Sequence, residues 1–578
     1  MPPALILAFL LSSGCGGGAS QPQITQTSPS QDFSLTLSTN AASVPQGGTS
    51  SPVNVLVKAQ NGFTGTVQVT LTNLPSGIVS APSSPFNVAA GANTAVVFGA
   101  IPSAAPGDFN ITAQATSGSL THSAGFSLAV QSAAGYTAQV FTNPVLNGEP
   151  APYKFLAYDQ KRKLLYFSAP SHIDFFDLHT ASFNTAGLTL DCPRFNSPGP
   201  CPDDDVRGLA LTPDGSQLLA ADFGSQNIYL LDPDTPGTPA VATTVAATGY
   251  NPTRVAATSA KTVFVALSAE ATPSGQCTSC LSQLDLTTNP PTIQSAPQPE
   301  LTNLTASPLV QADAAGGRVF LAFATPPGGP LGIWSPTQNS FTMSPTNEVA
   351  TDLSAAADGT FFATVNAGLI EIHSVDSNLV STLVGAFPSP GLTQLPGRVS
   401  VPGIAMHPSG ALVYQPFFTG PAPVVPPAVG VQGGVDVLDT HTGQLRLRVF
   451  LPEPLAALAS DADGQHAGFI ALDETGQKIF AITTSGLTVV QLTNVPLGIG
   501  TVSPATVSAS GGATITIRGS GFQSATMVTV GGKPIAVTFK DMNTLSAVTA
   551  AVSPGPQQIV LTNPDGESIT LDAAFAAN

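Results

Sequence analysis

The central part of this chain repeats one pattern seven times, and this repetition restricts the possible folds more than any single motif. Each copy holds an apolar strand, a tight turn rich in Asp and Gly, a second strand, a variable loop and a third strand. One copy reads VRGLALTPDGSQLLAADFGSQNIYLLD from Val206, and the last reads GFIALDETGQKIFAITTSGLTVVQL from Gly468. Because one copy cannot bury its apolar face alone, the copies are expected to pack against one another.

The copies resemble β-propeller blades of the YVTN or WD40-like kind, which have about four strands each. This resemblance implies a seven-bladed propeller over residues 136–495. The seventh copy stops after its third strand, at Leu487 to Asn494, whereas YTAQVFTNPV at Tyr136 to Val145 precedes the first blade without a partner. We expect these two segments to pair, since the pairing closes the ring and leaves no edge strand.

Two further β domains flank the repeats. Residues 32–131 alternate short apolar segments with Gly, Pro and Ser turns, which predicts a sandwich of about seven strands. Through VPQGG, NGFTGTVQV and APGDFNITAQAT the segment resembles immunoglobulin-like repeats of bacterial surface proteins. Residues 496–578 resemble an IPT/TIG domain, through GSGF at 519–522 and TNPDG at 562–566. The predicted fold is therefore all-β, a seven-bladed β-propeller flanked by two immunoglobulin-like β-sandwich domains.

The beginning of the chain predicts export. A short apolar run at Ala4 to Leu11 is followed by small residues that a signal peptidase needs. The arrangement resembles a bacterial lipoprotein signal over residues 1–15, which implies acylation at Cys15 and a flexible tether over residues 16–31. The expected location is the cell envelope, at the outer membrane or cell surface, with the membrane as partner through the lipid. An ordinary cleaved signal with an incidental cysteine is the alternative.

The other four cysteines lie in two local pairs, Cys192 with Cys201 and Cys277 with Cys280. An exported protein would oxidise such pairs, so we predict two loop-closing disulfides. A zinc site shared by the pairs is the alternative, but 75 residues separate them and no compensating histidines accompany them.

Charge and motifs argue against several functions. A net charge of −17 with only 17 Lys plus Arg opposes binding to nucleic acid. The sequence has no G-x-S-x-G, H-E-x-x-H or G-x-x-x-x-G-K-[ST] motif, and its seven histidines are scattered. The acidic segments SDADGQ at Ser460 and PDDDV at Pro202 carry oxygen ligands that calcium prefers, but such segments are more often solvated loops. We therefore predict no catalytic residue, metal ligand or cofactor.

Loop lengths indicate which propeller face binds. The turns between strands one and two and between strands three and four are short in every copy, and the long insertions fall between strands two and three or between blades. These insertions are Asp191 to Asp205, Ala269 to Cys280, Ser295 to Ser307 and Phe418 to Gly434. Length variation on a rigid scaffold is typical of loops that carry function, so the long-loop face is the predicted binding face.

Three cations occupy comparable positions at the starts of inner strands in consecutive blades, namely Lys154, Arg207 and Arg254. On so acidic a chain they predict an anionic ligand, such as a carboxylate or an acidic sugar. The alternative is that they only neutralise the carboxylates of Asp203, Asp204 and Asp205.

Three classes of function remain. The first is a binding or scaffold protein, anchored to the cell envelope, whose propeller presents a face to an extracytoplasmic small molecule, glycan or protein. The second is a propeller enzyme of lactonase or lyase type, which would need two or three carboxylates or histidines from different blades to meet at the axis. The third is a structural, wall-associated module without a specific ligand.

Overall fold

A computed structural model describes most of the chain between residues 30 and 578. The described ranges are 30–38, 41–45, 50, 52–100, 104, 107–131, 135–144, 153–169, 172–184, 188–190, 205–234, 240–247, 251–268, 280–295, 308–324, 329–366, 368–389, 398–400, 403–419, 432–456 and 469–578. The elements named within these ranges are all β-strands, so the predicted all-β fold is confirmed. In this part of the chain we find no helix with the length and apolar character that crossing a membrane requires.

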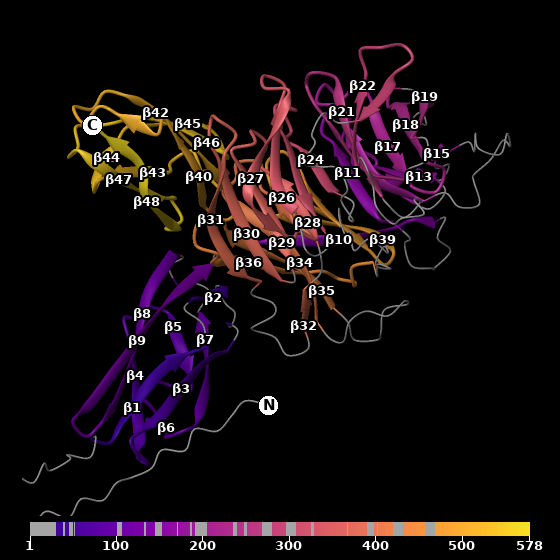
Figure 1. Ribbon diagram of the computed structural model, residues 1–578. Helices are drawn as coiled ribbons and strands as arrows, with labels where there is room; N and C mark the ends of the chain where they lie inside the picture. The colour runs from indigo at the N-terminus through magenta and orange to yellow at the C-terminus, as the bar shows by residue number, and fades with distance from the viewer. Residues whose placement is uncertain are drawn as a thin grey trace, which may run out of the picture.

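Seven antiparallel sheets form the blades of a propeller (Figure 1). Blade one holds β11 (Phe155–Asp159), β12 (Leu164–Ser168), β13 (His172–Asp177) and β14 (Ser182–Phe183), and β15 (Leu188–Thr189) also pairs with β13. Blade two holds β16 (Val206–Leu211), β17 (Leu218–Asp222), β18 (Asn227–Asp232) and β19 (Ala240–Ala246). Blade three holds β20 (Asn251–Ala257), β21 (Thr262–Ser268), β22 (Leu281–Asp285) and β23 (Thr292–Ser295).

The remaining blades follow the same order from the axis outward. Blade four holds β24 (Pro308–Ala312), β25 (Val319–Phe323), β26 (Gly329–Ser335) and β27 (Ser340–Glu348). Blade five holds β28 (Asp352–Ala355), β29 (Phe361–Asn366), β30 (Leu369–Val375) and β31 (Ser381–Pro388). Blade six holds β32 (Arg398–Ser400) and β33 (Ala405–Met406), both paired with β34 (Leu412–Thr419), then β35 (Gln432–Asp439) and β36 (Leu445–Phe450). Blade seven holds β37 (Ile470–Leu472), β38 (Lys478–Thr483), β39 (Gly486–Leu492) and, from the beginning of the propeller, β10 (Tyr136–Thr142).

The blades stack face to face, so their second strands are covered on both sides. All five residues of β17 and all five of β25 are buried, which explains why Leu218 to Ala221 and all of β25 are continuously apolar rather than alternating. Apolar clusters fill the interfaces between blades; between blades four and five, for example, Phe320 and Phe362 pack with their ring centroids 5.0 Å apart. Burial between blades, rather than within one sheet, therefore holds the ring together.

The ring closes as predicted. β10 pairs antiparallel with β39, from Tyr136 opposite Leu492 to Thr142 opposite Gly486, and so supplies the fourth strand of blade seven. Directly after β10, the buried Asn143 amide donates hydrogen bonds to Asp174 of blade one and to Tyr153, at 2.9 Å and 2.5 Å, and the Tyr153 hydroxyl donates to Asp174 at 2.6 Å. The two ends of the propeller are thus joined by a ladder and a buried polar network.

An N-terminal sandwich precedes the propeller. One sheet holds β1 (Asp32–Leu37), β3 (Val53–Gln60), β7 (Asn93–Ala100) and β5 (Ile78–Ala81). The other holds β2 (Ala41–Pro45), β9 (Leu120–Gln131), β8 (Gly107–Ser117), β4 (Thr66–Thr72) and β6 (Phe86–Ala89). Strand β4 shows the underlying pattern, since Val67, Val69 and Leu71 are buried and alternate with polar residues.

A second sandwich follows the propeller. One sheet holds β40 (Gly498–Ser503), β42 (Thr514–Ser520), β46 (Thr544–Val548) and β45 (Val537–Asp541). The other holds β41 (Thr506–Val507), β48 (Ser568–Ala577), β47 (Gly555–Thr562), β43 (Met527–Val530) and β44 (Lys533–Ile535). In both sandwiches the first two strands lie in different sheets and the second pairs in parallel with the last, β2 with β9 and β41 with β48.

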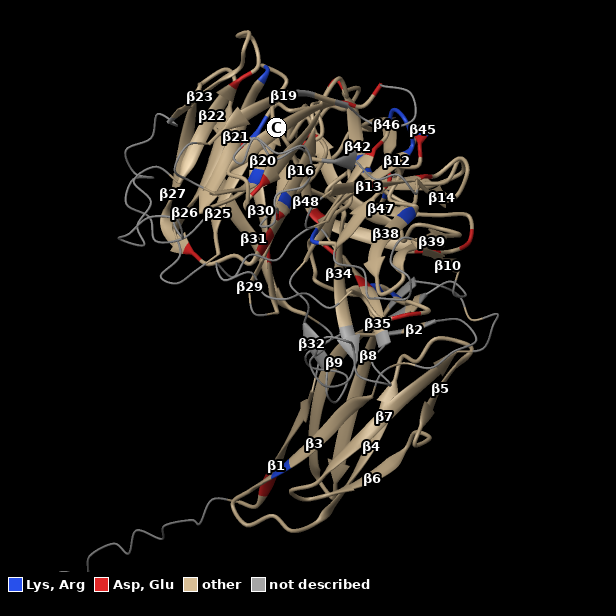
Figure 2. Cartoon of the chain, turned by 90° about the vertical axis from the view of Figure 1, so that its right-hand side faces the viewer, with Lys and Arg blue, Asp and Glu red and all other residues tan. Residues whose placement is uncertain are grey.

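Charge is distributed unevenly over the three domains. Asp32, Lys58 and Asp108 are the only charged residues between positions 32 and 131. Figure 2 shows the consequence, because the red and blue residues gather on the propeller and the C-terminal sandwich. The N-terminal sandwich contacts blade six through β2 and β9 against β36, where Gln444 Nε2 donates to Ser127 Oγ at 3.4 Å.

Candidate functional site

A channel of about 720 Å³ follows the propeller axis and is lined by residues of all seven blades. Its lining runs along the inner strands, from Phe155 to Lys161 in blade one and from Asp352 to Ala357 in blade five. The channel therefore has two mouths. The end where the inner strands begin, with Phe155, Arg254 and Asp352, is called the long-loop mouth, and the end where they finish is called the short-turn mouth.

Polar side chains at the short-turn mouth are used by the turns themselves. In six blades the residue at the end of the inner strand accepts a hydrogen bond from a backbone amide of the following turn. The pairs are Asp159 with Arg162 (3.0 Å), Thr212 with Gln217 (3.0 Å), Thr258 with Thr262 (3.2 Å), Asp313 with Gly317 (2.8 Å), His407 with Ser409 (3.2 Å) and Asp473 with Lys478 (3.0 Å). A polar residue at this position thus satisfies a backbone amide of the turn, and in three of the six blades that residue is Asp.

One of these turns shows why glycine is needed. Gly476 has a φ of +70°, and a Cβ at this position would lie 2.1 Å from the ring of His407 in the preceding blade. His407 is buried, and its Nε2 lies 3.1 Å from the carbonyl of Thr475. Burial lowers the pKa of His407 to about 4, so its imidazole is neutral at pH 7.

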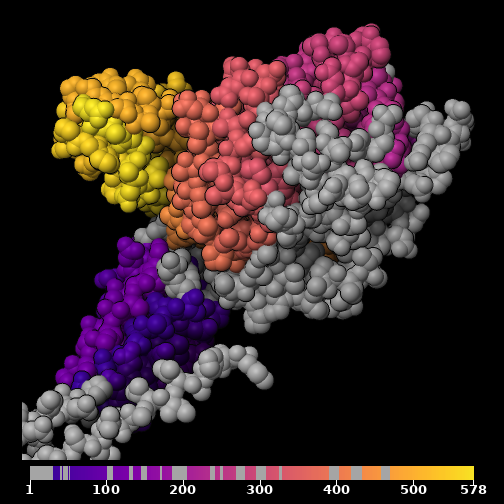
Figure 3. Space-filling model, viewed as in Figure 1, coloured from indigo at the N-terminus to yellow at the C-terminus, as the bar shows by residue number. Residues whose placement is uncertain are grey.

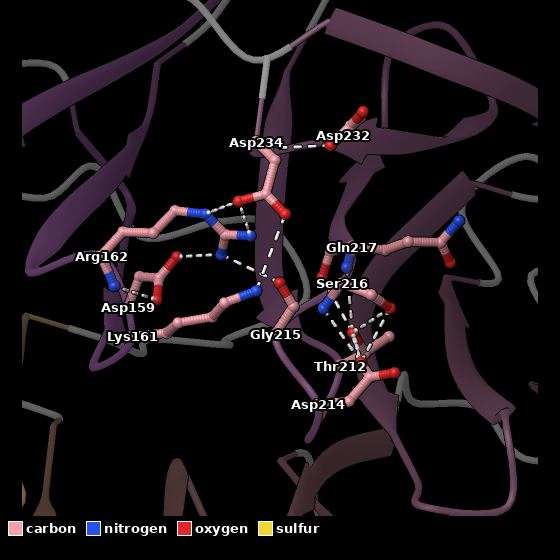
Figure 4. Close-up of polar contacts among 10 residues, drawn as sticks. All are labelled: Asp159, Lys161, Arg162, Thr212, Asp214, Gly215, Ser216, Gln217, Asp232 and Asp234. Atoms are coloured by element: carbon pink, nitrogen blue, oxygen red, sulfur yellow. Dashed lines mark hydrogen bonds and ion pairs between the residues drawn. The ribbon is translucent and has the colours of Figure 1, made fainter. Parts of the chain in front are cut away.

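Ion pairs connect the short turns of blades one and two (Figure 4). The Arg162 guanidinium contacts Asp159 at 2.7 Å and Asp234 at 2.6 Å, and it donates to the carbonyl of Gly215 at 2.9 Å. Hydrogen bonds from Ser216 and Thr212 lower the pKa of Asp214 to about 2. The charges in this region therefore have partners within the turns.

The C-terminal sandwich contacts the short-turn side of blades five to seven. Arg518 Nη1 lies 3.1 Å from Asp358 Oδ2 in the turn of blade five, and Asn543 donates to the carbonyl of Glu474 in the turn of blade seven at 3.3 Å. Figure 3 shows this sandwich, in yellow, against the orange part of the propeller. At its base, Glu567 accepts from Arg446 of blade six at 2.9 Å and from the Leu497 amide at 3.1 Å.

Of the three predicted cations, only Arg254 lines the channel. Lys154 directly precedes β11, Arg207 is the second residue of β16 and Arg254 is the fourth residue of β20. Lys154 Nζ and Arg207 Nε lie 2.8 Å and 2.7 Å from the two carboxylate oxygens of Asp205. These two cations thus neutralise one of the three carboxylates considered in the sequence, while Asp203 and Asp204 lie outside the described residues.

Arg254 reaches across the channel. Its guanidinium lies over the ring of Phe155 in blade one, 5.3 Å from the centroid, and only 8% of the residue is exposed. Its charge also acts on Asp352 of blade five, a carboxylate that accepts from the Ile404 amide at 3.2 Å. Burial raises the pKa of Asp352 to about 6, although Arg254 opposes this rise. The mouth thus holds a buried cation, an aromatic face and a carboxylate that titrates near neutrality.

The acylation of Cys15 and the two disulfides remain predictions. Cys15, Cys192, Cys201 and Cys277 lie outside the described residues, and Cys280 is buried directly before β22. The acidic segments at Pro202 and Ser460 also lie largely outside the described residues.

Sequence reasoning missed several residues of possible functional importance. Asp352 begins the inner strand of blade five, and aligning the copies on their inner strands could have found it. Glu348, Glu371 and His373 form a cluster between blades four and five. Because its residues come from two copies of the repeat, no motif within one copy indicates it.

The comparisons with known proteins concern the domains separately. Residues 497–576 match the IPT/TIG domain family, in agreement with the predicted C-terminal domain. The comparison with curated protein sequences returned no match.

The comparison with solved structures returned matches to about three fifths of the chain, and two of the three that follow are propellers by name. The β-propeller domain of Cps50 (Swd1) from Myceliophteria thermophila is 12% identical, with 59% of this chain and 97% of that chain covered and a TM-score of 0.42. Hydrazine synthase of Kuenenia stuttgartiensis is 14% identical, with 60% and 96% covered and a TM-score of 0.40. The Dos1 propeller is 12% identical, with 62% and 95% covered and a TM-score of 0.40.

The fold and the matched domain define a class of protein. A seven-bladed β-propeller is combined with an IPT/TIG domain, and this combination suggests a protein-interaction or scaffold role.

Proposed function

We propose that this chain is an envelope-anchored binding protein whose propeller takes an extracytoplasmic anionic ligand at the long-loop mouth. The ligand class is a carboxylate or an acidic sugar, either free or displayed on a glycan or protein. The observation that carries the proposal is the position of Arg254, a largely buried guanidinium that lines the channel beside an aromatic ring.

Arg254 suits a carboxylate because a guanidinium offers two parallel donors and is weakly hydrated, so its burial costs less than that of an ammonium. Phe155, over whose ring the guanidinium lies, also lines the channel and adds an apolar wall to the mouth. Lys154 and Arg207, which share Asp205 at the same mouth, add positive potential at the opening.

Asp352 gives the proposed site a pH dependence. Its carboxylate competes with a ligand carboxylate for Arg254, and its pKa of about 6 means that it can take a proton when a second anion arrives. Affinity for a carboxylate ligand is therefore expected to rise as the pH falls from 7.5 toward 6.

The opposite mouth is a poorer candidate for the ligand. Its polar side chains are engaged in turn hydrogen bonds, and the C-terminal sandwich contacts two of its turns. A tether acylated at Cys15 would anchor the chain through its N-terminal sandwich, which contacts blade six at β36.

A calorimetric titration with D-galacturonate, and with D-galactose as the neutral match, tests the ligand class. Binding of galacturonate but not galactose, lost in Arg254→Gln and retained in Arg518→Gln, supports the proposal. Equal binding of both sugars, or equal binding by both variants, would overturn it. Absence of binding to galacturonate and to a wider panel of carboxylates and acidic glycans would favour the purely structural module.

Membrane anchoring is tested separately by fractionating cells that express the parent or Cys15→Ala. The proposal expects the parent in the membrane fraction and the variant in the soluble exported fraction. Identical fractionation of the two would contradict lipid anchoring without bearing on the ligand.

A further inference from the structure

Three side chains that can bind metal meet between blades four and five, away from the channel. Glu348 is the last residue of β27, and Glu371 and His373 lie two residues apart on β30, so they project from the same face of that strand. Their potential ligand atoms all lie within 4.8 Å of one another. The cluster sits at the edge of the propeller where the inner strands begin.

The histidine is held rigidly and points into the cluster. His373 is 2% exposed and stacks on Phe362, its direct partner on β29, with centroids 4.7 Å apart and planes 10° apart. Its Nε2 and Glu348 Oε2 are both buried, and neither has a hydrogen-bond partner in the described part of the structure. Buried polar atoms without partners are rare and require an explanation.

The distance between His373 Nε2 and Glu348 Oε2 supplies an explanation for these unpartnered atoms. They lie 3.6 Å apart, which is too long for a hydrogen bond. Two ligands of a tetrahedral zinc ion, each about 2.0 to 2.1 Å from the metal, lie about 3.3 Å apart. The arrangement thus fits two metal ligands better than a direct contact.

The electrostatics agree with this geometry. Burial lowers the pKa of His373 to about 4, so the imidazole is neutral and can coordinate. Burial raises the pKa of Glu348 and of Glu371, and repulsion from Glu371 adds to the rise at Glu348. A cation would relieve the repulsion between these two carboxylates.

We propose that Glu348, Glu371 and His373 bind one divalent transition-metal ion, of which Zn²⁺ is the representative. The imidazole nitrogen favours such an ion over Ca²⁺ or Mg²⁺, which prefer sites made entirely of oxygen. Three protein ligands leave one position of a tetrahedral ion for water or an exogenous ligand. The ion would join the outer strand of blade four to the third strand of blade five, which are not paired with each other.

The test uses the full-length protein, stripped with EDTA and titrated with ZnCl₂ in a calorimeter. The parent should bind one more Zn²⁺ per chain than the Glu348→Gln/Glu371→Gln double variant. This variant keeps the side-chain shapes and removes two buried carboxylates, so it should fold, which circular dichroism checks. Saturating ZnCl₂ should raise the melting midpoint of the parent by a few degrees, as for any ligand that binds only the folded state.

The control is a surface pair, Asp177 and His179, which lie 3.3 Å apart and have no third metal-binding side chain close by among the described residues. Asp177→Asn/His179→Gln should keep the parental stoichiometry. Zinc X-ray absorption distinguishes the cysteines as an alternative source of ligands, because Zn–S bonds are about 2.3 Å long. Three outcomes would each overturn the proposal. The parent and the double variant could bind the same number of Zn²⁺ ions, the ion that only the parent binds could have sulfur ligands, or equimolar CaCl₂ could displace that ion.

Discussion

The two mouths of the channel differ in what their polar groups do. At the short-turn mouth, the side chains that end the inner strands accept hydrogen bonds from the turns, as Asp473 does from the amides of Gln477 and Lys478. At the long-loop mouth, Arg254 and Asp352 come from blades three and five and influence each other across the channel. The hydrogen bonds from the turns to the ends of the inner strands thus recur in most blades, whereas the pair of Arg254 and Asp352 occurs once and joins two blades.

This difference separates residues that specify the fold from residues that can bind a ligand. A side chain that ends an inner strand and accepts a hydrogen bond from its own turn stabilises that turn, and such a side chain occurs in six of the blades. A charge that occurs once and lies in the channel is not required by the repeat, and its burial costs stability. Substitutions at the two mouths should therefore change the free energy of unfolding in opposite directions.

The largest effect is expected at the short-turn mouth, from Asp473→Ala. The carboxylate accepts from two backbone amides and from the Thr475 hydroxyl, so its loss should destabilise the protein by about 4 kcal/mol in urea unfolding. Asp285→Ala, at the exposed end of β22, is the control and should cost much less. Equal losses of stability in the two variants would contradict the claim that Asp473 stabilises the turn at the short-turn mouth.

Acid should weaken the same mouth through His407. Its folded pKa of about 4 lies below the usual value of 6.5, so its contribution is complete above pH 6.5 and is lost as the pH falls toward 4. The loss is about 1.4 kcal/mol per pH unit and about 3 kcal/mol in total. His407→Gln should flatten the stability profile over this range, whereas the exposed His179→Gln should leave it unchanged.

At the long-loop mouth, a fall in pH should instead increase the stability of the fold. The folded pKa of Asp352, about 6, lies above the usual 3.8, so the ionised carboxylate disfavours folding above pH 6, and this cost disappears as the pH falls toward 3.8. Asp352→Asn should therefore stabilise the protein at pH 7.5, by about 3 kcal/mol. A loss of stability in this variant, measured against the exposed Asp541→Asn, would show that the carboxylate is structural.

The smallest effect is expected where the C-terminal sandwich meets the short turns. Arg518 is 42% exposed in its ion pair with Asp358, so water screens the attraction. Arg518→Ala should cost about 0.5 kcal/mol. Small-angle scattering should give the same radius of gyration as for the parent, and an expanded molecule would indicate that this pair holds the sandwich in place.

Much of the fold could be predicted because its signals lie within single copies. The strand–turn–strand pattern predicts the blades, and the incomplete seventh copy predicts that Tyr136 to Val145 closes the ring, which the pairing of β10 with β39 confirms. The turn residues were visible for the same reason, since Asp473 accepts hydrogen bonds within its own turn.

The candidate site could be predicted only in part. The positions of Lys154, Arg207 and Arg254 relative to their own strands place them at one mouth, but their partners belong to other blades. The approach of Arg254 to Phe155 and its influence on Asp352 depend on how the ring closes. The cluster of Glu348, Glu371 and His373 likewise exists only where two blades pack, so three isolated residues in the sequence give no sign of it.

The most direct test of the difference between the mouths is hydrogen–deuterium exchange with and without the anionic ligand. At saturating galacturonate, peptides that contain the starts of β11, β20 and β28 should be protected, and peptides that contain the turn from Asp473 to Lys478 should not change. Protection confined to the short turns, or no protection at the starts of these inner strands while the ligand is bound, would contradict the assignment of the long-loop mouth as the binding site.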